Sequence, residues 1–244
     1  MEKQPSYRSY HTLSPREYMY FPKGTMDVST PGQISQLEIL HILIAMIVLT
    51  VSFTFALTQS SLLMMYLFHS ATIPRFFMGL GVSFLGILSA FFVHEMSHKL
   101  MAQKYGLWSE FRMYPKGLLI SLCLSICTGF VFAVPGAVMF RGEPRPFEEG
   151  YIAVAGPGAN IVLAALTFPL LFISVSIMDN AFFFYTVGYI CFINTVLGFF
   201  NILPFGPFDG VVIMKWNKKI WIVLFIIACL LVGLLIPFIP QLLI

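Results

Sequence analysis

Apolar residues gather in long runs along this chain, and short segments with charged residues, glycine or proline separate the runs. About 20 apolar residues cross a bilayer as a helix, because a rise of 1.5 Å per residue then covers its roughly 30 Å hydrocarbon layer. The pattern predicts spans over residues 39–57, 76–105, 151–178, 181–203 and 220–243. We therefore expect an all-α polytopic membrane protein with about five transmembrane helices.

Composition narrows the class of protein further. The chain is 58% hydrophobic and only 10% charged, whereas ordinary soluble domains carry about 25% charged residues. The formal net charge of +3 is small and the basic residues are scattered, which gives no support to nucleic-acid binding. The expected surroundings of this chain are a lipid bilayer.

The N-terminal residues 1–36 differ from the rest, because they contain several basic residues and prolines and no long apolar run. Such a segment cannot form a packed core, and the first apolar run begins too late for a cleaved signal peptide. We predict a mobile cytoplasmic tail over residues 1–36 and one membrane domain over residues 37–244. A solvated tail is the simpler expectation, although the tail could also cover a site as a regulatory segment.

Two histidines and a carboxylate lie near the end of the second predicted span. His94 and His98 are four residues apart, so on a helix they share one face, with Glu95 beside them. This H-E-x-x-H spacing is typical of zinc peptidases. The alternative is a polar cluster that caps a membrane helix, but ionisable groups in membrane segments are costly and usually mark function. Lys99 and Lys104 follow the pair, and we expect both to extend toward water.

A catalytic zinc site needs a third protein ligand and an open position for water. Residues 99–106 contain no further His, Asp or Glu, so this ligand must come from elsewhere. Among the candidates, Asp209 lies in an apolar segment that Pro204 and Pro207 prevent from being a continuous helix. The other candidates are His11, His41, His69, Glu38 and Asp179. This position favours Asp209, while a role as a turn or N-cap aspartate stays open.

The distribution of basic residues predicts the topology. If the N-terminus is inside, five spans leave only Arg75 outside among the 14 lysines and arginines, as the positive-inside rule requires. Residues 117–140 are also apolar, but Gly129, Pro135 and Gly136 interrupt them. One more crossing there would place Asp209 on the membrane face opposite His94. We therefore predict a re-entrant or β-hairpin element between the second and third spans.

Three motifs together resemble the site-2 protease family of intramembrane metalloproteases. They are His-Glu-Met-Ser-His at residues 94–98, Gly-Pro-x-x-Asn at residues 156–160, and Asn-Ile-Leu-Pro at residues 201–204 followed by Asp-Gly at 209–210. The resemblance covers a core of about residues 76–213. Ser97 replaces a glycine of many members, and Val211 stands where many have a second glycine after the aspartate; neither departure changes a ligand.

The resemblance implies one Zn²⁺ per chain, held by His94, His98 and Asp209. It also implies that Glu95 is the catalytic base and that Asn201 donates a hydrogen bond to the oxyanion. β-strands are implied within residues 117–140, where an exposed strand edge could pair with an unwound substrate. Residues 156–160 are expected to form a packing and hydrogen-bonding helix face that includes Asn160.

The expected function is that of an intramembrane zinc metalloendopeptidase, which cleaves peptide bonds in or near transmembrane segments of membrane-protein substrates. We expect a multi-pass protein of a prokaryotic cell membrane with its active site toward the cytoplasmic side. A zinc-binding membrane transporter or a catalytically silent membrane chaperone could use the same ligands. The chain offers neither repeated halves nor a polar path through the bilayer, which argues against transport.

Overall fold

The computed structural model describes residues 34–68, 73–131, 134–142, 144–177 and 181–242. Most of the predicted tail, residues 1–33, therefore lies outside the described residues. Within them, five helices are long and apolar enough to cross a membrane, which confirms the predicted class of fold. The many exposed apolar side chains on these helices, such as Ile47, Leu166 and Leu230, suit a surface in contact with lipid.

Each predicted span is found within a few residues of its expected bounds. The first is α2, Gln36–Leu57, which the short helix α3, Leu62–Phe68, follows. The second consists of α4, Ile73–Ile87, the π-helical turn η1, Leu88–Phe92, and α5, Val93–Lys104. The third to fifth spans and the short helices beside them are α7, Pro146–Ile177; α8, Ala181–Ile202; α9, Gly210–Trp216; α10, Lys218–Leu235; η2, Ile236–Phe238; and α11, Ile239–Leu242.

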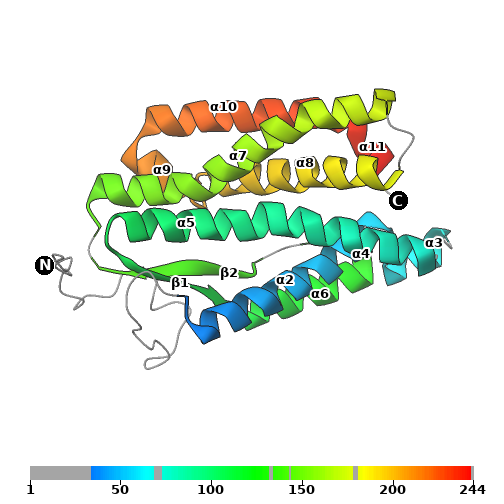
Figure 1. The fold of residues 1–244 in the computed structure, drawn as a ribbon, viewed down its shortest axis with the longest axis horizontal. Helices are drawn as coiled ribbons and strands as arrows, with labels where there is room; N and C mark the ends of the chain where they lie inside the picture. Colours follow the sequence, from blue (N-terminus) through cyan, green and yellow to red (C-terminus); the bar gives the residue numbers. More distant parts are fainter. Residues whose placement is uncertain (1–33, 69–72, 132–133, 143, 178–180, 243–244) are drawn as a thin grey trace, which may run out of the picture.

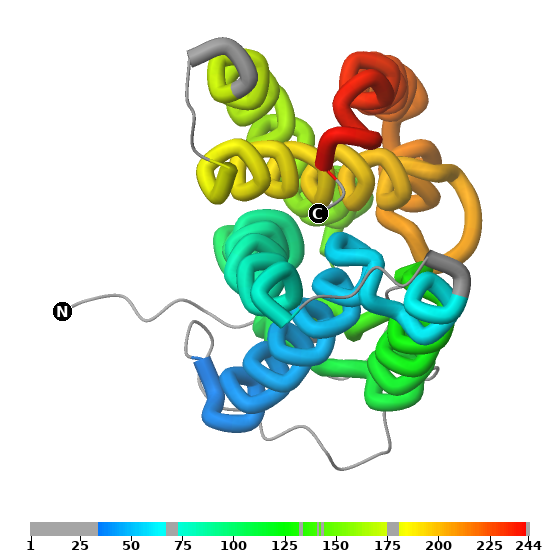
Figure 2. Tube along the Cα trace, turned by 90° about the vertical axis from the view of Figure 1, so that its right-hand side faces the viewer, coloured from blue at the N-terminus to red at the C-terminus, as the bar shows by residue number. Residues whose placement is uncertain are grey.

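The second span lies in the middle of the bundle. In Figure 1, α4 and α5 run between α2 and α6, Pro115–Thr128, on one side and α7 and α8 on the other, and Figure 2 shows the same order in a view turned by 90°. Apolar side chains from α2, the second span and α8 form one core, which includes Leu49, Phe91 and Tyr189. The face of α5 that carries the His pair is therefore covered by protein, whereas Leu100 on the same helix is exposed.

The element between the second and third spans is a two-stranded ribbon with a helix inserted in it. Strand β1, Trp108–Met113, pairs antiparallel with β2, Gly136–Arg141. Between them is α6, Pro115–Thr128, whose 14 residues reach about 21 Å and cannot cross the bilayer. Because Met113 is the partner of Gly136, the inserted chain begins and ends at the same end of the ribbon. This confirms the predicted β-hairpin element. Of the strands implied within residues 117–140, the described residues contain only β2, because β1 lies before that range and α6 forms a helix over residues 115–128.

Two buried ion pairs hold the ribbon region together. Lys99 is 3% exposed and pairs with Glu38, which is fully buried on α2. The expectation that Lys99 extends to water is therefore wrong, because a buried carboxylate one helix away neutralises its charge. Arg112 and Glu110, both on β1, form the second buried pair.

The chain opens between α8 and α9, as the two prolines require. Asp209 stands at the N-cap position of α9, yet its side chain makes no capping hydrogen bond. The carbonyl of Ile202, the last residue of α8, accepts a hydrogen bond of 2.8 Å from the indole nitrogen of Trp221 on α10. This bond satisfies a carbonyl that the end of α8 leaves without a helical partner. Because the Asp209 carboxylate caps no backbone N–H of α9, it is available to another group.

Candidate metal centre

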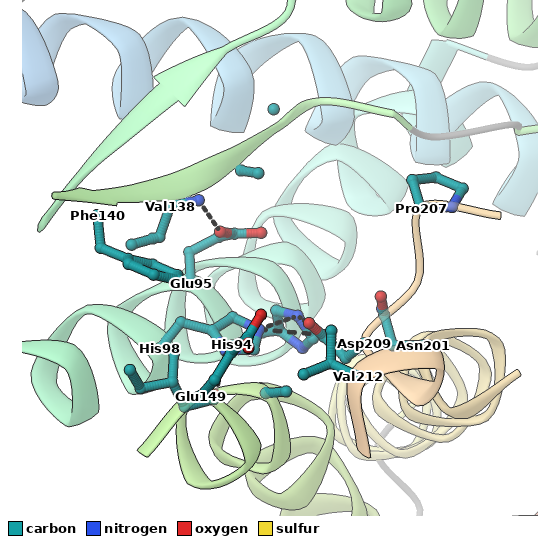
Figure 3. A pocket seen from close by; sticks show the side chains of 14 residues that line it. His94, Glu95, His98, Val138, Phe140, Glu149, Asn201, Pro207, Asp209 and Val212 are labelled. Atoms are coloured by element: carbon teal, nitrogen blue, oxygen red, sulfur yellow. Dashed lines mark hydrogen bonds and ion pairs between the residues drawn. The ribbon is translucent and has the colours of Figure 1, made fainter. Parts of the chain in front are cut away.

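The three predicted ligands converge at one point of the bundle (Figure 3). The Nε2 atoms of His94 and His98 are 3.0 Å apart, as expected for residues one turn apart on α5. The Oδ2 atom of Asp209 lies 3.5 Å from Nε2 of His94 and 3.2 Å from Nε2 of His98. Among the described residues, these three form the group of His, Cys, Asp and Glu side chains that could hold a metal ion.

The spacing of these atoms fits a tetrahedral zinc site. Ligand atoms about 2.0–2.1 Å from one zinc ion at tetrahedral angles are about 3.3–3.4 Å from one another. The three distances at this site bracket that value. The side chains of His94 and His98 are buried, with 5% and 10% exposure. Two imidazoles and a carboxylate are a donor set that zinc prefers, and they leave the fourth position for water.

The outer nitrogen of each imidazole is engaged by a hydrogen-bond acceptor. His98 Nδ1 donates to the carbonyl oxygen of Ile152 at 2.7 Å, and His94 Nδ1 donates to Oδ1 of Asn160 at 2.6 Å. Both acceptors are on α7. Because a hydrogen-bonded Nδ1 carries the proton, the Nε2 lone pair of each ring is directed at the common point, as in metal-binding histidines generally.

A chain of hydrogen bonds fixes the orientation of the Asn160 amide. Its Nδ2 donates to the carbonyl oxygen of Ala90 and to Oδ1 of Asn194, both at 3.0 Å. Nδ2 of Asn194 donates in turn to Ser89 Oγ at 3.1 Å. Ala90 belongs to the π-helical turn η1, and its carbonyl oxygen also accepts a hydrogen bond from the backbone N–H of Val93. With both amide hydrogens used, Oδ1 of Asn160 must face His94, which confirms the expected hydrogen-bonding role of this helix face.

Gly156 on α7 lies directly against the two imidazoles. A Cβ atom at this position would be 2.3 Å from Nε2 of His98 and 2.7 Å from Nε2 of His94. The space that a methyl group would fill is therefore the space in front of the ligand atoms. Only glycine leaves it free.

Glu95 is close to the ligands and points into the same pocket (Figure 3). Its side chain is buried, and Oε2 accepts a hydrogen bond of 3.1 Å from the backbone N–H of Val138 on β2. The ribbon thus holds the carboxylate from the side opposite α7. The sequence predicted Glu95 beside the His pair but gave no sign of this contact.

Asn201 also lines the pocket, and its Nδ2 donates to the carbonyl oxygen of Leu197 at 3.0 Å. Glu149, at the start of α7, lines it as well and was not predicted. In the sequence Glu149 is one of two adjacent acidic residues at a helix start, where carboxylates are common for reasons of helix stability. The pattern therefore could not separate it from its neighbour Glu148, which pairs with Arg145.

The other candidates for the third ligand do not join this cluster. Glu38 is engaged by Lys99 and by the backbone N–H of Phe111, and His41 lies on α2 apart from the metal-binding group. His11, His69 and Asp179 lie outside the described residues.

Comparison with known proteins gives one informative similarity. The chain is 36% identical over 189 residues to a protein of Methanocaldococcus jannaschii that is named "Putative zinc metalloprotease". The match covers 77% of this chain and 88% of the archaeal protein. No protein-family model and no solved structure matches the chain.

Proposed function

Because this chain belongs to the same family as the Methanocaldococcus jannaschii protein named "Putative zinc metalloprotease", we propose that it is an intramembrane endopeptidase of the site-2 protease type. The observation that carries the proposal is the position of the metal-binding group. His94 and His98 are on a helix long and apolar enough to span the membrane, and the segment that follows another such helix supplies Asp209. A protease with its ligands on membrane spans acts on peptide bonds that lie in or near the bilayer.

His94, His98 and Asp209 would hold one Zn²⁺ per chain. When bound, zinc supplies Lewis acidity, which makes water a nucleophile near neutral pH and polarises a peptide carbonyl. The imidazoles contribute their Nε2 lone pairs because Ile152 and Asn160 hold the outer nitrogens. The carboxylate of Asp209 would neutralise part of the metal charge.

Glu95 is the proposed general base. Its carboxylate takes a proton from the attacking water while the water oxygen bonds to the carbonyl carbon of the substrate. As the C–N bond breaks, Glu95 gives this proton to the departing amine nitrogen. The hydrogen bond from Val138 supports this role, because it holds the carboxylate in place beside the ligands.

Asn201 is the proposed donor to the oxyanion. A side-chain amide has two N–H groups, and the contact with Leu197 uses one of those of Asn201. The second remains to stabilise negative charge that develops on the carbonyl oxygen.

The proposed substrates are transmembrane segments of other proteins in the same bilayer. A helix hides its peptide bonds behind side chains and hydrogen bonds, so the cut segment must unwind locally. Residues that destabilise helices are therefore expected near cut sites. The archaeal relative and the positive-inside pattern support a prokaryotic cell membrane with the site toward the cytoplasm.

The test of this proposal uses Glu95→Gln in the purified full chain. The amide cannot accept the proton, so cleavage of a transmembrane substrate in detergent should fall by about 10²–10⁴-fold, the usual contribution of a general base. Zinc content, measured by atomic emission, should equal that of the wild type, because no ligand is changed. The matched control is Glu149→Gln, a pocket carboxylate without a proposed proton-transfer role.

Two results would contradict the proposal. Full turnover by Glu95→Gln would exclude this residue as the base. Zinc uptake into vesicles by a wild type that cleaves no membrane substrate would favour a transporter.

A further inference from the structure

The two outer edges of the ribbon are each held by a carboxylate. Phe111 on β1 and Val138 on β2 are directly opposed partners. The N–H of Phe111 donates to Oε1 of Glu38 at 2.9 Å, and the N–H of Val138 donates to Oε2 of Glu95 at 3.1 Å. Both N–H groups therefore point away from the partner strand, as in a non-hydrogen-bonded pair of an antiparallel ladder. This one pair of residues is bound from both sides.

The two carboxylates are joined through α5. Lys99 follows Glu95 by four residues on this helix, so the two side chains project from one face. Lys99 in turn pairs with Oε2 of Glu38, whose other oxygen holds Phe111. A closed ring of contacts results, which runs from Val138 to Glu95, along α5 to Lys99, through Glu38 to Phe111, and across the ribbon back to Val138.

The residues of this ring are buried, and their contacts restrict movement of the ribbon. Glu38 and Phe111 are fully buried, and Lys99 and Glu95 are 3% and 8% exposed. Phe111 also packs edge-on against Phe91, with ring centroids 5.5 Å apart, and Ser109 Oγ donates to the carbonyl oxygen of Lys99 at 3.2 Å. Buried contacts of this kind leave the ribbon little freedom to move relative to α5.

We propose that Glu38 and Lys99 are positioning residues, which fix the ribbon so that the N–H of Val138 holds the carboxylate of Glu95 in its working position. The inference rests on the proposed function, since it concerns the same base. Neither residue is expected to touch substrate or metal. Their contribution is geometric, and small displacements of catalytic groups are costly, with about 10²-fold lost for about 1 Å.

An ion pair that merely stabilises the fold would predict something different. Replacing a buried ion pair by apolar residues of similar size is often neutral for stability. In that case only charge balance and volume at positions 38 and 99 would matter. Under the positioning proposal, the acceptor at position 38 for the N–H of Phe111 is the essential part.

Two double variants separate these readings. Glu38→Gln with Lys99→Met removes both charges and keeps an amide oxygen that can accept from Phe111. Glu38→Leu with Lys99→Met has a similar volume and no acceptor. The full-length variants in detergent are compared for zinc content, for kcat and KM on a transmembrane substrate, and for amide hydrogen exchange of residues 136–141. Glu95→Ala serves as the exchange reference, because it removes the acceptor of Val138 directly.

The positioning role predicts that the Gln variant keeps most of the wild-type kcat and slow exchange in β2. The Leu variant should lose about 10²-fold in kcat with zinc content and KM close to wild type, and its β2 exchange should approach that of Glu95→Ala. Equal kcat and equal exchange in the two double variants would overturn the inference. If the wild type cleaved no membrane substrate, the protease proposal would fail, whereas the exchange comparison would still confirm or overturn the positioning role.

Discussion

At the scale of single residues, the His pair owes its geometry to groups on another helix. Spacing within α5 brings the two Nε2 atoms together, but Asn160 and Ile152 on α7 decide which nitrogen of each ring faces the metal position. The hydrogen bonds of Asn160 to Ala90 and Asn194 leave its amide one orientation. Asn160 therefore acts on the site through His94.

Replacing Asn160 tests this role. Asn160→Leu removes the acceptor for Nδ1 of His94, so zinc affinity should fall by about 10–100-fold, as for other outer partners of metal-bound histidines. Competition with a chelator of known affinity measures the change. Asn160→Asp keeps an oxygen toward His94 and should bind zinc more tightly than the Leu variant. Wild-type affinity in Asn160→Leu would show that His94 needs no partner there.

The convergence of His94, His98 and Asp209 was expected from two local patterns together with the family resemblance of the three motifs. Two histidines four residues apart share a helix face in any context, and two prolines open the backbone beside Asp209 wherever it lies. The Val138 contact of Glu95 and the presence of Glu149 in the pocket were not predictable. Both depend on how the ribbon and α7 approach α5, which no local pattern encodes.

At the scale of elements, close packing of α7 against α5 shapes the centre. Gly156 lets the α7 backbone approach the imidazoles, while Gly158, two residues on, has only an ordinary contact with Val154 at 3.7 Å. The two glycines belong to one helix and one motif but differ in what a side chain would meet.

The pair gives a matched comparison. Gly156→Ala places a methyl group 2.3 Å from Nε2 of His98, so zinc content should fall far below one per chain. Gly158→Ala should bind zinc as the wild type does. Metal analysis of both purified variants, with thermal unfolding to check that each is folded, measures the difference. Full zinc occupancy in Gly156→Ala would mean that α7 can retreat from α5.

Element bounds were predictable where length and hydropathy decide, and less so elsewhere. The five spans needed only apolar runs long enough for a bilayer. The 14-residue helix α6 lies in an apolar stretch that periodicity alone cannot assign to helix or strand. Strand β1 is only six residues long, and its burial does not alternate, because the charged residues Glu110 and Arg112 are buried by pairing with each other. The π-helical turn η1 has no composition signal at all.

At the scale of the whole molecule, the spans place the site near one end of the bundle. The Lys104 end of α5, the segment with Asp209 and the start of α10 lie together at one end in Figure 1, while α3 lies at the other. From the positive-inside rule we propose that the first end faces the cytoplasm.

Labelling in cells tests this orientation. Single cysteines are introduced at Lys219 and Tyr66, both exposed, in a chain whose four native cysteines are replaced by serine. A membrane-impermeant maleimide should label position 66 in intact cells and position 219 only after the membrane is opened. Labelling of both positions from outside would contradict the five-span topology.

Through the hydrogen bond from Trp221 to Ile202, the last span contributes directly to the structure beside the metal centre. Within a bilayer no water is available to the backbone oxygen that the end of α8 sets free. The indole N–H of Trp221 on α10 donates the hydrogen bond that water would otherwise supply, just before the chain turns toward Asp209. The residues that support the metal centre consequently extend from Glu38 on the first span to Trp221 on the fifth. The three sequence motifs cover only a small part of that length.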